Sequence, residues 1–300
     1  MSDFTEPLRE HPSTYFVQDR SNLQEMERLD IQDKMVTVEM GGVLPELADP
    51  TILRRVLDVG CGTGGWLIET AKTYPTIEHL FGGDVSGKIV AYARTKAESL
   101  ELNGRVQFKT MDALRVLEFP PASFDLVNQR LAASWLRTWE WKKILLEYQR
   151  VTRPGGIVRI TEANIVESNS PALTKLWNIF LEVFFRSGHY FTLSHDGLTS
   201  ELARLMTQHG FEDVQTRVSP WDYRVGTELG QFYYQDTAQF FRLLLPFLQK
   251  WTNVPSNYEE IYQQALKDMQ QPDCVANNHL ITVWGVRPRN GKTMLMRGLQ

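Results

Sequence analysis

The sequence VLDVGCGTGG at residues 56–65 constrains the fold more than any other feature of the chain. Its first four residues, VLDV, form a β-prone run with three apolar members, and glycines follow at positions 60, 62, 64 and 65, where a helical pattern begins. Glycine allows a tight turn and lets backbone amides approach a ligand without an intervening Cβ. A strand, a glycine-rich turn and a helix in this order predict a βα unit that binds a ligand at the turn.

Short β-branched runs alternate with helical stretches between residues 52 and 163, which indicates βαβ units and a parallel sheet. We expect five strands here, at 54–60, 78–84, 105–111, 124–129 and 157–163. We expect intervening helices at 64–74, from the N-cap Ser86 to before Gly104, and at 139–151. The pattern outside this region predicts a leading helix from Ser21 to about Met40, a helix at 198–209, and strands at 211–219 and 280–286.

Composition limits the class of protein. Apolar residues make up 42% and charged residues 23% of the 300 residues, as in ordinary globular proteins. A net charge of −4 without a long basic block weighs against a general nucleic-acid binder. The chain has no run of 18 apolar residues and a polar start, so we expect no membrane span and no secretory signal. Two distant cysteines, Cys61 and Cys274, predict neither a disulfide framework nor a metal site, and favour a cytoplasmic protein.

Three carboxylates lie in or directly after the first three strands, namely Asp58, Asp84 and Asp112. The carboxyl ends of parallel strands share one edge of the sheet, where ligands of such folds bind. Asp84 is placed to accept both hydroxyls of a ribose, which suits either a nicotinamide dinucleotide or an adenosyl ligand. Asp58 would repel a pyrophosphate but attract an ammonium group, and so favours a cationic ligand.

The order and spacing of these motifs resemble those of class I S-adenosylmethionine-dependent methyltransferases. The resemblance is carried by VLDVGCGTG (56–64), FGGDVS (81–86), MDA (111–113), FDLVNQR (124–130) and RVTRPGGIVRI (150–160). It implies a Rossmann-like α/β fold with a seven-stranded, mostly parallel sheet in the order 3-2-1-4-5-7-6, flanked by helices. It also implies S-adenosyl-L-methionine as the cofactor. Within the family the chain is most similar to the small-molecule branch that includes quinone-biosynthesis and secondary-metabolite methyltransferases.

The resemblance also implies which residues contact the cofactor. The glycines would line its methionine part with support from Asp58, Asp84 would hold the ribose, and Asp112 would meet the adenine. The full set of expected contacts is Tyr15, Asp58, Gly60, Cys61, Gly62, Gly64, Asp84, Val85, Met111, Asp112, Ala113, Gln129 and Arg130. Of these, Tyr15 would close over the cofactor from the leading helix, and Gln129 with Arg130 would meet the aminocarboxylate end.

Aromatic residues are concentrated in two segments. Of the 33 aromatic residues, 17 lie in 164–197 and 220–278. We interpret both segments as helical cap insertions that bury their own core and line an apolar acceptor pocket. The residues expected to contact the acceptor are Trp135, Tyr190 and Trp221. A catalytic base would be needed if the acceptor loses a proton, and His189 and His11 are the candidates.

We therefore expect one methyltransferase domain at 46–288 with these two insertions, a helical lead-in or lid at 1–45 and a mobile tail at 289–300. Its expected reaction is in-line methyl transfer to oxygen, carbon or nitrogen of a small, largely apolar metabolite, without a metal ion. Two alternatives remain open at this point: a nicotinamide-dependent oxidoreductase and a non-catalytic regulatory module that binds the cofactor. The acceptor, the methylated atom and the oligomeric state are not determined by the sequence.

Overall fold

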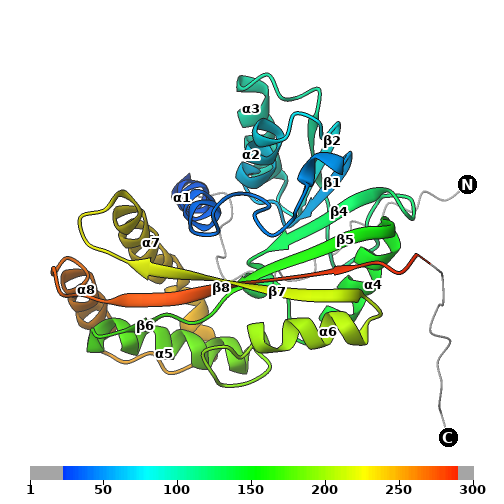
Figure 1. The fold of residues 1–300 in the computed structure, drawn as a ribbon. Coiled ribbons are helices and arrows are strands. Elements are labelled where there is room, and N and C mark those ends of the chain that lie inside the picture. The colour runs from blue at the N-terminus through cyan, green and yellow to red at the C-terminus, as the bar shows by residue number, and fades with distance from the viewer. Residues whose placement is uncertain (1–22, 290–300) are drawn as a thin grey trace, which may run out of the picture.

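Strand β4 (Phe124–Arg130) lies near the middle of one large sheet in the computed structural model, which describes residues 23–289. The sheet order is β3-β2-β1-β4-β5-β8-β6, and β7 pairs with β8 (Figure 1). The remaining strands are β1 (Arg55–Val59), β2 (His79–Asp84), β3 (Val106–Thr110), β5 (Thr152–Ala163), β6 (Glu167–Ser168), β7 (Glu212–Tyr223) and β8 (Ala276–Val286). β1 to β5 pair in parallel, whereas β8 is antiparallel to β5, β6 and β7. The predicted fold class is confirmed, with the two-residue β6 as an additional strand.

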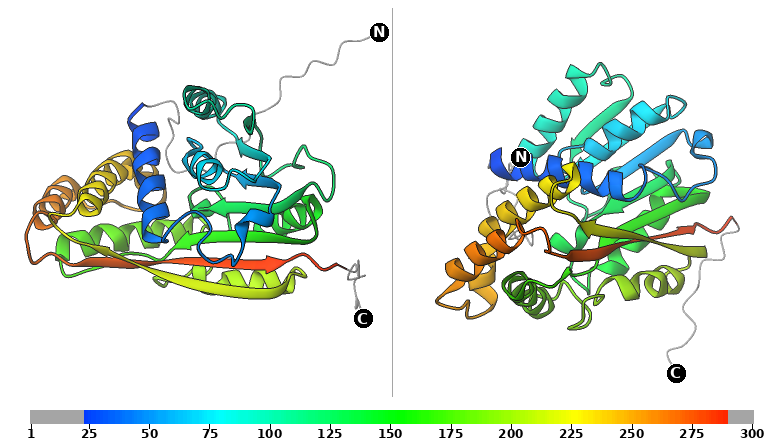
Figure 2. Two further views of the ribbon diagram at one scale, coloured as in Figure 1. Left: turned by 45° about the horizontal axis from the view of Figure 1, so that its top comes forward. Right: turned by 60° about the vertical axis from the view of Figure 1, so that its left-hand side comes forward.

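Helices cover both faces of the sheet (Figure 1). They are α1 (Leu23–Glu39), α2 (Gly65–Thr73), α3 (Gly87–Ser99), α4 (Trp141–Val151), α5 (Pro171–Arg186), α6 (Leu202–Gln208), α7 (Glu228–Trp251) and α8 (Tyr258–Asp268). The expected N-cap is present, because the Ser86 hydroxyl accepts a hydrogen bond from the Ile89 amide at 3.4 Å. Helix α1 lies between α7 and α2, so it bridges two parts of the molecule that are far apart in sequence (Figure 2).

The antiparallel pair β7 and β8 is longer than the sequence predicts. Trp221 pairs with Asn278 and Tyr223 with Ala276, beyond the predicted strand ends at 219 and 280. These four side chains are buried and alternate with exposed neighbours, so the two-residue period continues past the predicted ends. The extended pair forms an arm that carries α5, α7 and α8, which we call the cap helices (Figure 1).

The cap helices bury aromatic side chains against one another. Trp177 packs edge-on against Phe180 and Phe241, with ring centroids 5.4 and 4.9 Å apart. Phe180 also lies 5.4 Å from Phe240 of α7. Aromatic pairs at these separations add about 0.5–1.5 kcal/mol each beyond the area they bury. The aromatic residues concentrated in these segments thus give the arm a core of its own, which is continuous with that of the sheet.

Candidate functional site

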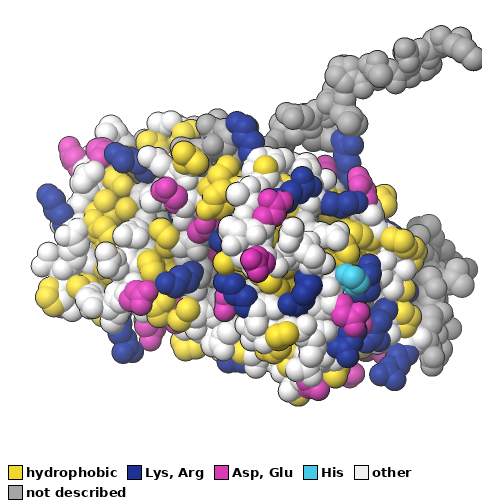
Figure 3. Space-filling view, turned by 90° about the horizontal axis from the view of Figure 1, so that it is seen from above, with side chains coloured by type: hydrophobic (Ala, Val, Ile, Leu, Met, Phe, Trp, Pro, Cys, Tyr) yellow, Lys and Arg dark blue, Asp and Glu magenta, His cyan; other side chains and the backbone are white. Residues whose placement is uncertain are grey.

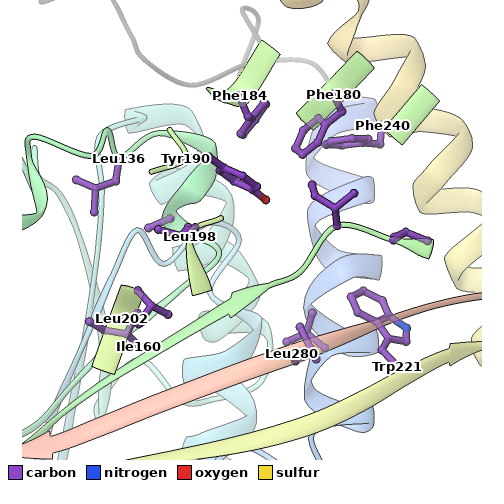
Figure 4. Packing of buried hydrophobic residues seen from close by; sticks show 14 of the residues in the cluster. Leu136, Ile160, Phe180, Phe184, Tyr190, Leu198, Leu202, Trp221, Phe240 and Leu280 are labelled. Carbon is purple, nitrogen blue, oxygen red and sulfur yellow. The ribbon is translucent and has the colours of Figure 1, made fainter. Parts of the chain in front are cut away.

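One cavity of about 1380 Å³ runs from the carboxyl ends of the parallel strands to the cap helices. Its first part, which we call the strand-end half, is lined by the glycine loop, the residues that follow β2 and β3, and α1. Its second part, the aromatic half, is lined by Trp177, Phe180, Phe184, Tyr190, Trp221, Tyr233 and Phe240. In Figure 4 several of these side chains face a common space between α1 and the cap helices.

The glycine loop opens onto the strand-end half. Gly60 has φ +70°, and its amide donates to the Gly83 carbonyl at 2.8 Å. Gly62 has φ +51°, and a Cβ placed there would meet no atom within 4 Å, so the loop presents bare backbone to the cavity. Such a conformation and such an approach both favour glycine. The Gly62 amide donates to the Asp84 carboxylate at 3.3 Å, which joins the loop to the end of β2.

Gly64 has a different role from the one expected. A Cβ at Gly64 would lie 2.4 Å from the ring of Phe108, and its φ of +76° also favours glycine. Gly64 does not line the cavity, although Gly60 and Gly62 do. The close packing of the α2 N-terminus against β3 therefore accounts for this glycine without a ligand.

The three strand-end carboxylates, Asp58, Asp84 and Asp112, all line the cavity. Asp84 also accepts from the Ser86 amide at 2.8 Å, and Asp112 accepts from the Leu114 amide at 2.9 Å. Asp84 and Asp112 are thus each oriented by a backbone turn. Cys61, Val85, Met111, Ala113 and Arg130, which the sequence also predicts as cofactor contacts, line the same half. Burial raises the pKa of the Cys61 thiol well above its usual range, so this cysteine stays a neutral thiol.

Asp58 is held by a buried polar network. Strand register places Asp58, Asn128 and Arg159 side by side on β1, β4 and β5. The side-chain Nδ2 of Asn128 donates to Asp58 at 2.7 Å, and Arg159 donates to the side-chain Oδ1 of Asn128 at 2.6 Å. Arg159 also forms a fully buried ion pair with Glu46. This network orients the Asp58 carboxylate toward the cavity.

Burial raises the pKa of Asp58 to about 7, although the Arg130 charge and the Asn128 hydrogen bond act in the opposite direction. The unfolded chain loses this proton near pH 4, about three pH units earlier. Between about pH 4 and 7 the folded state therefore binds more protons at Asp58 than the unfolded state does. Asp58 thus makes the ligand-free protein less stable as the pH rises through this window, until the folded-state carboxyl ionises.

We expect Asp58→Asn to raise the melting temperature of the ligand-free protein by at least about 2 °C at pH 8. The gain should shrink toward pH 5, because the wild-type carboxyl is then protonated in the folded state. Thermal unfolding of both proteins across this pH range measures the difference. Asp112→Asn, which changes a carboxylate that is only partly buried, serves as the matched control. A gain that is equal at pH 5 and pH 8 would contradict this account of Asp58.

The two residues expected at the aminocarboxylate end point in different directions. Arg130 lines the cavity, forms an ion pair with Asp33 of α1 and donates to the Thr37 hydroxyl at 3.2 Å. Gln129 is fully buried away from the cavity and accepts a hydrogen bond from Tyr148 of α4. Consecutive residues of a strand point to opposite faces of a sheet, so only one of the two can face the ligand. The expectation for Gln129 is corrected accordingly.

Trp135, Tyr190 and Trp221 line the cavity, as expected of residues that contact an acceptor. The Trp135 ring lies against the glycine loop, because a Cβ at Gly60 would be 3.2 Å from it. Trp221 packs edge-on against Tyr233, with ring centroids 5.5 Å apart. Trp135 therefore lies where the strand-end half meets the aromatic half.

The histidine predicted as a base does not reach the cavity. His189 is fully buried behind Phe184, with ring centroids 5.0 Å apart, and its Nδ1 lies 3.2 Å from the Leu136 carbonyl oxygen. Burial, together with the charge of Arg137, lowers the pKa of His189 to about 4. The expectation that His189 faces the acceptor is therefore wrong. The other candidate base, His11, and the expected cofactor contact Tyr15 lie outside the described residues.

Sequence reasoning missed Glu162, a fully buried carboxylate that lines the cavity at the end of β5. Its two oxygens accept from the backbone amides of Ala132 and Ala133, at 2.7 and 3.2 Å. Burial raises the pKa of Glu162 to about 8, against the effect of the two amides. Its position at a strand end was the one signal available, and the same signal identified Asp84 and Asp112.

Residues 56–156 match the family model described as "Methyltransferase domain". The chain is 38% identical to a demethylmenaquinone methyltransferase from Deinococcus radiodurans over 109 residues. This aligned region covers 36% of this chain and 43% of that protein. A protein of the same description from Lactiplantibacillus plantarum is 28% identical over 174 residues, which cover 53% of this chain and 71% of that protein. The chain thus spans less than half the length of the first of these relatives.

The fold is shared with a solved structure of Haemonchus contortus phosphoethanolamine N-methyltransferase 2 in complex with S-adenosyl-L-methionine. The TM-score is 0.52 at 20% sequence identity, and the match covers 84% of this chain and 52% of that one. In residues 23–289, no helix is long and apolar enough to cross a membrane. The same residues contain no group of three or more His, Cys, Asp or Glu side chains that could hold a metal ion.

Proposed function

We propose that this chain, whose residues 56–156 match a methyltransferase domain, is a class I S-adenosylmethionine-dependent methyltransferase that methylates a small, largely apolar metabolite bound in the aromatic half of the cavity. The observation that carries the proposal is the continuity of the two halves in one cavity, with Trp135 at the junction. When bound, S-adenosyl-L-methionine supplies an activated methyl group on a sulfonium. The chain then has to position an acceptor in line with that group, which supplies about 7–11 kcal/mol in well-oriented reactions.

The residues of the strand-end half fit this cofactor. Gly62 leaves open space at the position that a Cβ would fill, and the buried Asp58 faces the cavity as a site for an ammonium group. Asp84 would accept the ribose hydroxyls, and Asp112 would accept from the adenine amine. Arg130, held by Asp33, would meet the carboxylate of the amino acid part. The Asp58 carboxylate is unfavourable for a pyrophosphate, so the geometry supports a nicotinamide cofactor less well.

The aromatic half suits a small apolar acceptor better than a charged polymer. Its walls are mainly ring faces on α5, α7 and β7, which bind apolar or planar groups. On the face seen from above, basic and acidic side chains of the described residues are intermingled over the surface (Figure 3). A nucleic-acid site would instead need a concentrated basic patch.

The proposal places the protein in the cytoplasm, where the free cysteines Cys61 and Cys274 would stay reduced.

Binding calorimetry with S-adenosylhomocysteine and NADH separates this proposal from the nicotinamide alternative. We expect binding of S-adenosylhomocysteine and none of NADH, and the reverse result would overturn the proposal. Transfer of a tritiated methyl group to a panel of phenols, quinols and amines then separates an enzyme from a regulatory module. Tight cofactor binding without transfer to any member of a broad panel would favour the regulatory module.

A further inference from the structure

We propose that Glu162 accepts the proton that the acceptor releases, and that the acceptor presents a hydroxyl group on an aromatic or enolic carbon. This inference rests on the proposed methyl transfer and specifies the class of acceptor. Neither the sequence motifs nor the relatives assign a role to Glu162. The carboxylate is at the carboxyl end of β5, in the wall that joins the two halves of the cavity.

Backbone contacts fix the Glu162 carboxylate at this junction. The Ala132 and Ala133 amides, which hold its two oxygens, belong to the turn that leads from β4 to Trp135. On the other side, residues 163–166 continue the cavity wall toward Tyr190. The carboxylate thus lies between the tryptophan at the glycine loop and a tyrosine of the aromatic half. A proton acceptor for a bound hydroxyl has to occupy this place, within hydrogen-bond reach of the reacting atom.

Holding the turn after β4 does not use the whole hydrogen-bonding capacity of Glu162. A carboxylate has about four lone-pair sites; the two amides occupy one on each oxygen, and the Gln129 side chain acts on a third. Within residues 23–289, no lysine, arginine or histidine forms an ion pair with Glu162. A buried carboxylate without a cationic partner is costly, and groups of this kind are concentrated at functional sites. The remaining lone-pair site can serve a hydroxyl in the cavity.

The ionisable groups around Glu162 are consistent with this role. Burial raises the pKa values of the Tyr190 and Tyr148 phenols, and the nearby charge of Glu162 contributes to both shifts in the same direction. The Gln129 side chain acts on Glu162 as a hydrogen-bond donor and lowers its pKa. Burial raises the pKa of Glu162 itself to about 8, within about two units of an aromatic hydroxyl. A small difference of this kind suits proton transfer near neutral pH.

The step balances without a further reactant. The acceptor O–H bond breaks, and the proton forms an O–H bond on Glu162. The electron pair left on the oxygen would form the O–C bond to the methyl group, while the C–S bond of the sulfonium would break with its electron pair on the sulfur, which leaves as a neutral thioether. The neutral Glu162 carboxyl returns the proton to water after the product leaves. An acceptor whose hydroxyl is already methylated has no proton to give, and this difference provides the test.

The test compares 2-naphthol with 2-methoxynaphthalene as binding probes, with S-adenosylhomocysteine present throughout. At about pH 8.5, where the Glu162 carboxyl is mostly ionised and the naphthol is not, we expect the wild-type protein to bind the naphthol about 10-fold more tightly or better, which corresponds to one hydrogen bond to a charged group. Glu162→Gln should reduce this preference to less than about 3-fold. Asp273→Asn should keep it, because this exposed carboxylate in the turn before β8 does not line the cavity. A merely structural role of Glu162 would weaken the binding of both probes equally.

Each outcome leads to a different conclusion. If S-adenosylhomocysteine does not bind, the proposed function itself fails. If it binds and the wild-type protein shows no preference for the hydroxyl, or binds neither probe, the inference about Glu162 is overturned and the proposed cofactor stands. A preference lost in Tyr190→Phe would assign hydroxyl recognition to Tyr190 instead. If Glu162→Gln does not fold, the pH dependence of the wild-type preference decides the matter: the preference should shrink as the Glu162 carboxyl becomes protonated below about pH 8, and a preference that does not change with pH overturns the inference.

Discussion

Replacing Asp84 with alanine should weaken the binding of S-adenosylhomocysteine by about 100-fold. The carboxylate is expected to accept two ribose hydroxyls, and each hydrogen bond to a charged group contributes about 1.5–3 kcal/mol. The same side chain accepts from the amides of Gly62 and Ser86, so its loss also loosens the glycine loop. Calorimetric titration of the wild-type protein and the variant measures the change.

Two further variants calibrate this result. Asp112→Ala removes one expected contact to the adenine and should cost only about 10-fold in affinity. Asp273→Ala changes an exposed carboxylate in the turn before β8 and should leave the affinity unchanged. If Asp84→Ala binds S-adenosylhomocysteine as tightly as Asp273→Ala does, the ribose is not held by Asp84.

Breaking the buried ion pair behind Asp58 should have the largest effect on stability. Arg159→Met would leave Glu46 buried without its partner, and the loss of one member of such a pair costs about 3–5 kcal/mol. The side-chain Oδ1 of Asn128 would also lose its hydrogen bond from Arg159, whose donor–acceptor distance is 2.6 Å. Urea denaturation of the ligand-free protein measures the free energy of unfolding.

The double variant Glu46→Leu with Arg159→Met separates the unpaired charge from the loss of packing. Removal of both charges should recover more than about 1 kcal/mol of the stability that Arg159→Met loses, because no buried charge then remains unpaired. A double variant less stable than Arg159→Met alone would show that the ion pair is not the source of the effect. A loss below about 1 kcal/mol in Arg159→Met would contradict the account of the network.

The sheet and the strand-end carboxylates could be predicted because their signals are local. The glycine loop, the alternation of strands and helices, and an Asp in or directly after each of the first three strands are all contained in short stretches of sequence. The parallel arrangement then brings Asp58, Asp84 and Asp112 to one edge, whatever the side chains around them. The sequence predicts Trp135 only as an acceptor contact, and the structure adds that its ring lies against the glycine loop.

The direction of single side chains could not be predicted in the same way. The His189 ring lies beside Phe184 of α5 and near the Leu136 carbonyl oxygen. The contact with Leu136 joins residues that are far apart in the sequence, so local patterns do not predict it. Gly64 is required because the ring of Phe108 in β3, forty-four residues later in the chain, leaves no room for a Cβ. The position of the Glu162 carboxylate depends on hydrogen bonds from two amides of the turn after β4, which the sequence does not indicate. Only the alternation of Gln129 and Arg130 along a strand could have been used earlier.

A crystal structure with S-adenosylhomocysteine bound tests the central claim most directly. The account predicts the ribose hydroxyls on Asp84, the ammonium group near Asp58, and the sulfur directed past Trp135 toward Tyr190 and Trp221. Glu162 would then face the open space next to the sulfur. A ligand whose sulfur points away from the aromatic half, or that lies outside this cavity, would contradict the account.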